Sequence, residues 1–163
     1  EWFERGRPSV LGVISGAVAG LGTITPASGF VLPWHGIVIG AIAGIVCYYA
    51  CTSLKQKLKY DDSLDVFGVH GVGGILGTLA AGIFATGSLS VAADTPAGIS
   101  GLLEGNARQL GVQAVGVIIS IGWCALGTYI CLKLIDAICG LRASSEDERQ
   151  GLDLSLHGEA IHQ

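Results

Sequence analysis

The sequence predicts an all-α polytopic membrane protein with four transmembrane helices. Half of its 163 residues are hydrophobic and only 13% are charged, whereas a soluble domain usually carries about 25% charged residues. Between Arg7 and Lys55 there is no formally charged side chain. That interval is too long for one membrane span of roughly 20 residues and fits two spans with a turn between them.

We expect the four spans at residues 9–30, 34–54, 64–85 and 109–132. Prolines, glycines and the interfacial Trp34 mark the turn between the first two spans. The third span begins in an acidic segment, and after Asp65 the chain has no Lys, Arg, Asp or Glu until Asp94. Buried helices of soluble proteins have similar periodicity, but the number, length and low charge of these segments favour the membrane.

Lysine and arginine residues predict the orientation of the spans. Eight of the nine fall in segments that four spans would place on one side of the membrane, and only Arg108 falls on the other. The positive-inside rule assigns the first group to the cytoplasm. Both chain ends are therefore expected inside, with residues 85–108 as an outer loop. We accordingly divide the chain into a membrane region, residues 1–139, and a cytoplasmic tail, residues 140–163.

Small residues at four-residue spacing predict close packing between the helices. They form three ladders, Gly12–Gly16–Gly20, Gly36–Gly40–Gly44 and Gly73–Gly77–Ala81. Lipid provides no hydrophobic drive between membrane helices, so close backbone approach holds them together. The five cysteines lie in or beside apolar spans without a Cys-x-x-Cys pair, so neither a metal site nor a cofactor is expected.

His70 is the foremost candidate functional residue. It follows Asp65 by five residues on a glycine-rich apolar helix, or about 7.5 Å along the helix at 1.5 Å per residue, and is expected below the cytoplasmic surface. A titratable ring is costly to bury in a membrane and is more often functional than incidental. Such a ring suits a weakly acidic cation that must shed a proton to cross, or a proton relay, although a structural hydrogen bond is the alternative.

Other residues near His70 have predicted roles beside it. Val66 and Phe67 are one turn earlier, where an apolar wall would form a dry constriction. Asp62 and Asp65 are placed to cap the helix start. Thr25 precedes Pro26, where the first helix must end or kink, and a pathway-lining role is open to it. We interpret His35, next to Trp34, as an interfacial residue on the outer side.

The tail after residue 139 is polar and differs from the rest of the chain. Ser145 and Glu148 have the spacing of a capping box. Two further segments, 151–153 and 157–159, have the composition of turns. A solvated tail is one interpretation, and a docking or control element on the cytoplasmic face is the other.

Together these residues resemble the ammonium transporter (Amt/Mep/Rh) family, and the Amt branch in particular. The resemblance rests on three motifs in family order, residues 15–21 with 24–30, residues 61–74, and the tail segments 140–142, 151–153 and 157–159. It implies the C-terminal part of an eleven-helix fold, with the last four helices and the tail. The first residue is Glu1 rather than Met, which also led us to expect a piece of a longer protein.

The resemblance also implies roles for individual residues. His70 corresponds to the second of two pore histidines that share a hydrogen bond, Val66 to a pore-wall residue, and Asp62 and Asp65 to acidic residues at the cytoplasmic end of that helix. It further implies a homotrimer in the plasma membrane that takes up ammonium as a nitrogen source, without enzyme activity. The implied regulatory residues of the tail are Gly140, Leu141, Arg142, Glu148, Gly151, Asp153, His157, Gly158 and Glu159.

In the family this tail contacts neighbouring subunits and receives a PII-type signal protein. Gln150 and Ile161 depart from the family pattern, which weakens the expectation of PII binding. The other pore histidine and the first inverted repeat are absent, so four helices alone should not conduct. Two alternatives stay open, an ammonium sensor or regulatory membrane protein, and a split or degenerate half-protein. The short tail favours a regulated transporter over the sensor.

Overall fold

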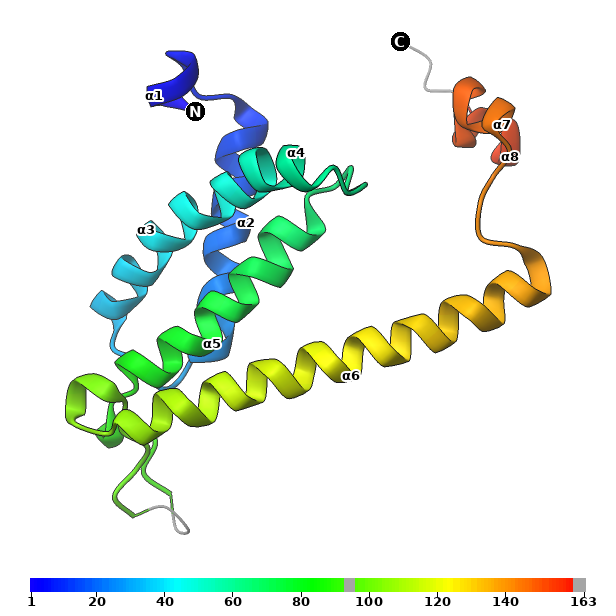
Figure 1. Ribbon diagram of the computed structural model, residues 1–163. Helices are drawn as coiled ribbons and strands as arrows, with labels where there is room; N and C mark the ends of the chain where they lie inside the picture. The colour runs from blue at the N-terminus through cyan, green and yellow to red at the C-terminus, as the bar shows by residue number, and fades with distance from the viewer. Residues whose placement is uncertain (93–95, 160–163) are drawn as a thin grey trace. The chain divides into compact units, whose positions relative to one another are not determined.

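A computed structural model describes residues 1–92 and 96–159, and their regular structure is helical (Figure 1). By their contacts, the residues divide into two compact units, Glu1–Ile119 and Ser120–Gln163. This division falls inside one long helix, so it does not test the expected boundary between membrane region and tail. The longer helices are α2 (Val10–Ile24), α3 (Pro33–Tyr49), α5 (Gly73–Phe84) and α6 (Ala107–Cys139).

In the part of the chain that the structure describes, four helical segments are long and apolar enough to cross a membrane, Val10–Ala27, Pro33–Leu58, Phe67–Phe84 and Ala107–Cys139. The four-helix prediction therefore stands. The second and fourth segments extend past their expected ends at residues 54 and 132. The second continues from α3 to the end of α4 (Lys55–Leu58), and the fourth continues to Cys139. The third segment starts later than residue 64, since Leu64 lies in a turn and is 83% exposed.

The start and end of α2 follow from its terminal residues. Ser9 is the N-cap, and its hydroxyl accepts a hydrogen bond of 2.9 Å from Gly12 N. At the other end, Pro26 enters a 3-10 turn, η1 (Thr25–Ala27). The Thr25 hydroxyl donates to Leu21 O at 2.7 Å, so the helix end that the sequence predicted is closed by the residue before the proline.

Within the first unit, α2, α3 and α5 pack against one another in pairs (Figure 1). Most of the buried side chains between them are small. On α2 and the following turn they are Ala19, Thr23 and Ala27, and on α5 they include Ala80 and Ala81. The helix backbones approach closely there, as membrane helices with small residues do.

The third glycine ladder lies in this interface. A Cβ built on Gly73 would lie 2.8 Å from Thr23 Oγ1 and 3.4 Å from Cys47 Sγ. A Cβ on Gly77 would overlap the Thr23 carbonyl oxygen and come within 3.2 Å of Pro26 Cδ. Glycine is therefore required where α5 crosses the end of α2.

Among the described residues, the other two glycine ladders contribute little to this interface, where a Cβ on Gly36 would lie 3.8 Å from Ile24 Cδ1. A Cβ on Gly16, Gly20, Gly40 or Gly44 would have no described heavy atom within 4 Å. The buried stripe on α3 runs instead through the residues one position earlier, His35, Ile39, Ala43 and Cys47. Both stripes have a four-residue period, so the spacing alone could not distinguish the helix face that packs from the face beside it.

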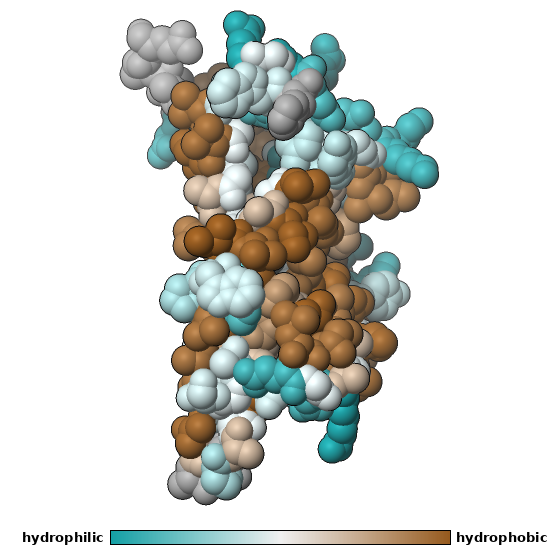
Figure 2. Space-filling model, turned by 90° about the vertical axis from the view of Figure 1, so that its left-hand side faces the viewer, coloured by the Kyte–Doolittle hydropathy of each residue, from teal (hydrophilic) through white to brown (hydrophobic). Residues whose placement is uncertain are grey.

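Much of the surface of the first unit is hydrophobic, as a membrane location requires. Figure 2 shows brown residues across the middle of the face that includes α3 and teal residues gathered mainly toward its upper end. On α3, Ile37 is 76% exposed and Ile45 is 62% exposed. Soluble monomers seldom expose so much contiguous apolar surface.

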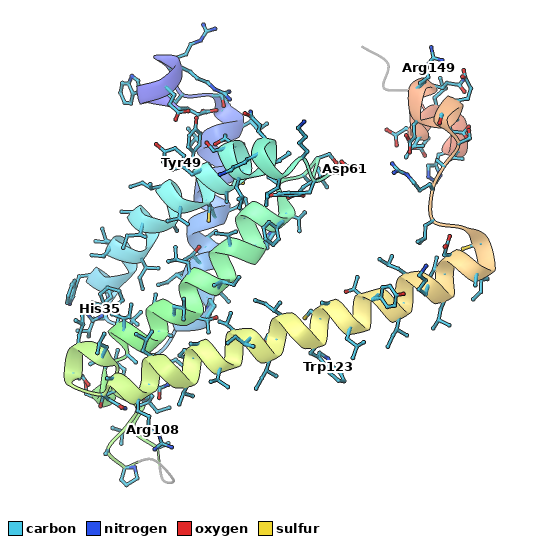
Figure 3. All side chains as sticks on the ribbon, in the orientation of Figure 1. His35, Tyr49, Asp61, Arg108, Trp123 and Arg149 are labelled. Carbon is cyan, nitrogen blue, oxygen red and sulfur yellow. The ribbon has the colours of Figure 1, made fainter. Side chains whose placement is uncertain are left out.

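The basic residues of the first unit are unevenly divided between its two ends. Figure 3 places His35 and Arg108 at one end, and Tyr49 and Asp61 at the other. The loop of Lys55, Lys57 and Lys59 adjoins Asp61 in the sequence. The arrangement agrees with the sidedness on which the predicted orientation depends, although the orientation itself stays a prediction.

Candidate functional site

The candidate site lies where the third membrane segment begins, and Asp62 caps that beginning. The Asp62 carboxylate accepts hydrogen bonds from Val66 N at 2.8 Å and Phe67 N at 2.9 Å. Both donors belong to the first turn, whose N–H groups have no partner within the helix. A carboxylate is also favoured at this position by the helix dipole.

Asp65 does not cap the helix, contrary to our expectation. Its backbone is in the left-handed region, with φ of 55°, and its carboxylate pairs with Lys55 Nζ at 2.8 Å. The same ammonium group donates to the Asp62 backbone oxygen. Lys55, near the end of the second membrane segment, therefore binds both Asp62 and Asp65. Lys55 and Asp65 are ten residues apart, so the spacing rules for side-chain pairs within one helix do not predict this ion pair.

Replacing Asp62 with alanine should lower the free energy of unfolding by about 0.5–2 kcal/mol, because two N–H groups lose their acceptor. The measurement is the thermal-unfolding midpoint of a purified protein that contains this chain. Asp61→Ala is the matched control, since Asp61 is an exposed neighbour of the same charge. Equal midpoints for the two variants would contradict the capping role.

The turn that carries His70 is π-helical rather than α-helical. Segment η3 (Phe67–Val72) leads directly into α5, and a second π-helical segment, η2 (Ala50–Leu54), continues α3. Each π turn holds one residue more than an α turn, and π turns are frequent at functional sites. We found no feature of the hydrophobic pattern that predicts either segment.

The His70 ring lies against α2 and is otherwise exposed within this chain. A Cβ built on Gly22 would be 3.8 Å from His70 Nδ1, an ordinary van der Waals contact, so the ring lies directly beside this turn of α2. Val66 is 50% exposed and Phe67 is 48% exposed. All three residues are exposed at or near the start of η3.

Phe67 also has structural contacts. Its ring meets the Tyr60 ring edge-on, with centroids 5.5 Å apart, and a Cβ on Gly71 would be 3.0 Å from it. Burial, followed by the nearby Asp62 carboxylate, raises the pKa of the Tyr60 phenol above its ordinary value. Thr25 is three residues beyond Gly22 in the sequence, and its hydroxyl is already bonded to Leu21 O.

A cavity of about 620 Å³ lies near the same end of the first unit, between α1 (Trp2–Arg5), α2, α3 and the start of the third segment. Its lining is mixed and includes Arg5, Tyr48, Lys55 and Asp65. Tyr48 donates a hydrogen bond of 2.6 Å to Glu4, which ties α1 to α3. His70 is not among the lining residues, although its neighbour Val69 is.

His35 is buried, although we interpreted it as an interfacial residue. Its side chain is 5% exposed and lies beside the rings of Trp34 and Phe84, with centroids 3.8 and 5.0 Å away. Its Nδ1 accepts a hydrogen bond from Leu32 N at 3.2 Å. His35 thus helps to close the first turn of α3, a role that its apolar sequence neighbours did not indicate.

The tail begins at Gly140, whose φ of 78° ends α6. The capping serine of α7 (Ser145–Gln150) is Ser144, whose hydroxyl accepts a hydrogen bond from Asp147 N at 3.1 Å. Our assignment of Ser145 and Glu148 was therefore wrong by one residue. Glu148 instead pairs with Arg142 at 3.2 Å.

The two expected turns of the tail are smaller than predicted. Gly151 and Gly158 have φ of 98° and 66°, but Leu152 and Asp153 already belong to α8 (Leu152–His157). The Asp153 backbone oxygen accepts a hydrogen bond from Glu159 N at 3.0 Å, which closes the end of α8. Leu141 is exposed, and Ile161 lies outside the described residues. The proposed regulatory roles of the tail residues stay predictions.

Among the described residues, no three His, Cys, Asp or Glu side chains gather in a way that could hold a metal ion. Cys47 and Cys51 have free thiols. The arrangement therefore offers a histidine ring, apolar side chains and a capped helix start, which is chemistry suited to admitting a small polar solute or a proton.

Comparison with known proteins identifies the family. The model of the Ammonium Transporter Family matches residues 1–161. This chain belongs to the ammonium transporter family. An ammonium transporter of Bacillus subtilis is 44% identical over 163 residues, covering 100% of this chain and 39% of that protein. Ammonium transporter Amt1 of Archaeoglobus fulgidus is 45% identical, covering 97% of this chain and 38% of that protein.

Solved structures agree with the family assignment and the fold. The crystal structure of Saccharomyces cerevisiae Mep2 matches with a TM-score of 0.76 and 37% identity, covering 89% of this chain and 33% of that one. A structure described as a sensor Amt protein matches with a TM-score of 0.76 and 34% identity, covering 95% of this chain and 36% of that one. This chain thus spans about a third to two fifths of the length of the relatives that it matches.

Proposed function

We propose that the complete protein containing this chain moves ammonium or ammonia across the plasma membrane. The observation that carries the proposal is the position of His70, which lies against Gly22 on a face that this chain leaves exposed. Membrane transporter sites form between repeats, so a face left open by one repeat is where a pathway would run. The relatives' names, ammonium transporters, supply the substrate.

In this proposal His70 forms a hydrogen bond with the solute or transfers a proton to or from it. A second histidine, from another part of the protein, lies next to His70. A neutral imidazole can donate from one nitrogen and accept at the other. Val66 and Phe67 supply an apolar wall, next to which a neutral species passes more cheaply than an ion. Thr25 adds a polar group from the end of α2, close to Gly22 in the sequence.

Orientation, assembly and regulation belong to the same proposal. The positive-inside count supports a cytoplasmic C-terminus, and family membership supports a homotrimer. The tail residues Arg142, Glu148, Asp153 and His157 are in two short helices and the segment that precedes them, a compact element that could receive a PII-type signal protein.

The second candidate function is ammonium sensing, because one structural relative is described as a sensor Amt protein. The two functions differ in one measurable respect. A transporter moves substrate through the membrane at a sustained rate, whereas a protein that only senses binds substrate without a comparable flux.

The test is ammonium flux into proteoliposomes that contain the complete protein. We expect an ammonium-dependent flux well above that of empty liposomes prepared in the same way. Saturable ammonium binding without any flux above the empty liposomes would favour the sensor and overturn the transport proposal.

A further inference from the structure

Two π-helical segments, η2 and η3, pack against each other at the candidate site. The contact is centred on Gly68 and Cys51. A Cβ built on Gly68 would overlap Cys51 Sγ and lie 3.0 Å from Cys51 N and 3.2 Å from Cys51 Cα. Gly68 is buried, so a side chain at this position could not turn away into solvent.

The Lys55 ammonium group restrains the same pair of segments from one end. Lys55 directly follows η2, and it binds the Asp65 carboxylate and the Asp62 backbone oxygen just before η3. The Lys55 and Asp65 side chains are 29% and 40% exposed, so water screens their attraction only in part. The pair joins the end of one π turn to the start of the other.

His70 lies two residues beyond Gly68 in the turn that these contacts restrain. A π turn contains one residue more than an α turn. If η3 relaxed to α geometry, His70 would turn about the helix axis relative to the fixed cap at Asp62. The ring would then lose its place beside Gly22. The direction in which the imidazole points depends on keeping the π turn.

We propose that Lys55, Cys51 and Gly68 are positioning residues for His70, which act by holding the π turn that presents its ring to the pathway. The inference rests on the proposed function and deepens it. Lys55 and Asp65 fix where the turn begins, and the Gly68–Cys51 contact fixes how closely it packs. Small misplacements of a reacting group can cost large factors in rate, so restraints of this kind matter for function as well as for stability.

The first test replaces Lys55 with methionine in the complete transporter, which removes the charge and keeps most of the side-chain length. Two quantities are measured, the ratio of ammonium flux to potassium flux in proteoliposomes and the NMR signals of the His70 ring in histidine-labelled protein. His70→Gln identifies those signals by their disappearance. Potassium is the comparison ion because it resembles ammonium in charge and size but cannot release a proton.

We expect Lys55→Met to lower the flux ratio roughly two- to fivefold, the scale of a partly exposed ion pair, and to shift the His70 ring signals. Lys55→Arg should restore both, because it keeps the charge. Arg149→Met is the matched control; it breaks an exposed ion pair with Glu146 in the tail and should change neither quantity.

A loss of total flux with an unchanged ratio and unchanged His70 signals would overturn the proposal, since the pair would then serve stability alone. A changed ratio without a shift of the ring signals would overturn it too, because Lys55 would act without moving His70. Shifted signals with an unchanged ratio would show that this movement does not matter for transport. If the unaltered protein carried no ammonium, the proposed function would fail, and the ring signals would still test the positioning role.

The second test uses Gly68→Ala, alone and combined with Cys51→Ala. The single variant should shift the His70 signals at least as strongly as Lys55→Met does, and the double variant should recover part of the shift, because Cys51 Sγ is the atom that the new Cβ overlaps. Gly68→Ala protein with His70 signals like those of the unaltered protein would contradict the inference. The double variant also retains a test if the single variant does not fold.

Discussion

Replacing His70 with alanine in the complete transporter is expected to abolish ammonium flux or to reduce it by roughly tenfold or more. A hydrogen bond to a charged partner contributes about 1.5–3 kcal/mol, and each 1.4 kcal/mol corresponds to about a factor of ten. The solute would lose this bond at a point where apolar neighbours offer no substitute. The measurement is the initial rate of ammonium uptake into proteoliposomes at matched protein density.

Two further variants separate the chemistry of His70 from its volume. His70→Asn keeps hydrogen-bonding groups but cannot take up a proton near neutral pH, so residual flux in this variant would assign the ring mainly a hydrogen-bonding role. Val72→Ala changes another residue of the same π turn and should retain most of the flux. Flux and selectivity unchanged in His70→Ala would remove His70 from the pathway.

The number of membrane helices followed from the sequence because hydrophobicity and charge determine them locally. Pro26 predicted where the first helix ends, and the acidic residue Asp62 predicted the cap of the third. These features depend on the chemistry of a few adjacent residues. The predicted start of the third helix, at residue 64, was less accurate. Asp65 adopts a left-handed backbone conformation and forms an ion pair instead of capping the helix.

Features that depend on tertiary contacts could not be predicted in the same way. Two stripes with a four-residue period lie next to each other on α3, one of glycines and one that includes Ile39 and Ala43, and packing against α2 and α5 buries the second. The π turns have no pattern of their own. In the tail, Ser144 and Ser145 each precede an acidic residue by three positions, so the capping residue was ambiguous.

The candidate site also has one feature that the local sequence predicted and others that depend on tertiary contacts. The cost of burying a histidine in an apolar span made His70 conspicuous in the sequence. Its contact with Gly22, and the support that η3 receives from Cys51 and Lys55, come from segments distant in the sequence. Rules that use neighbouring residues do not register such support, because the contacting residues are far apart in the sequence.

The crossing at Gly77 is expected to tolerate substitution least. The Cβ of alanine at this position would overlap the carbonyl oxygen of Thr23 and lie 2.9 Å from its carbonyl carbon. These are backbone atoms at the end of α2, and they can move away only if the helix moves. Excess volume in a packed interior costs about 1–3 kcal/mol and occasionally more. For Gly77→Ala we expect the upper part of that range, because no side-chain rotation relieves the overlap.

The measurement is the thermal-unfolding midpoint of the complete transporter in detergent, with Gly40→Ala as the matched control. A Cβ on Gly40 meets no described atom within 4 Å, and alanine favours a helix over glycine by about 1 kcal/mol, so the control should unfold at the same temperature or slightly higher. Gly77→Ala should unfold at a clearly lower temperature. Indistinguishable midpoints for the two variants would mean that α5 does not approach α2 as closely as this structure places it. The surface around His70, which depends on the same pair of helices, would then need a different geometry.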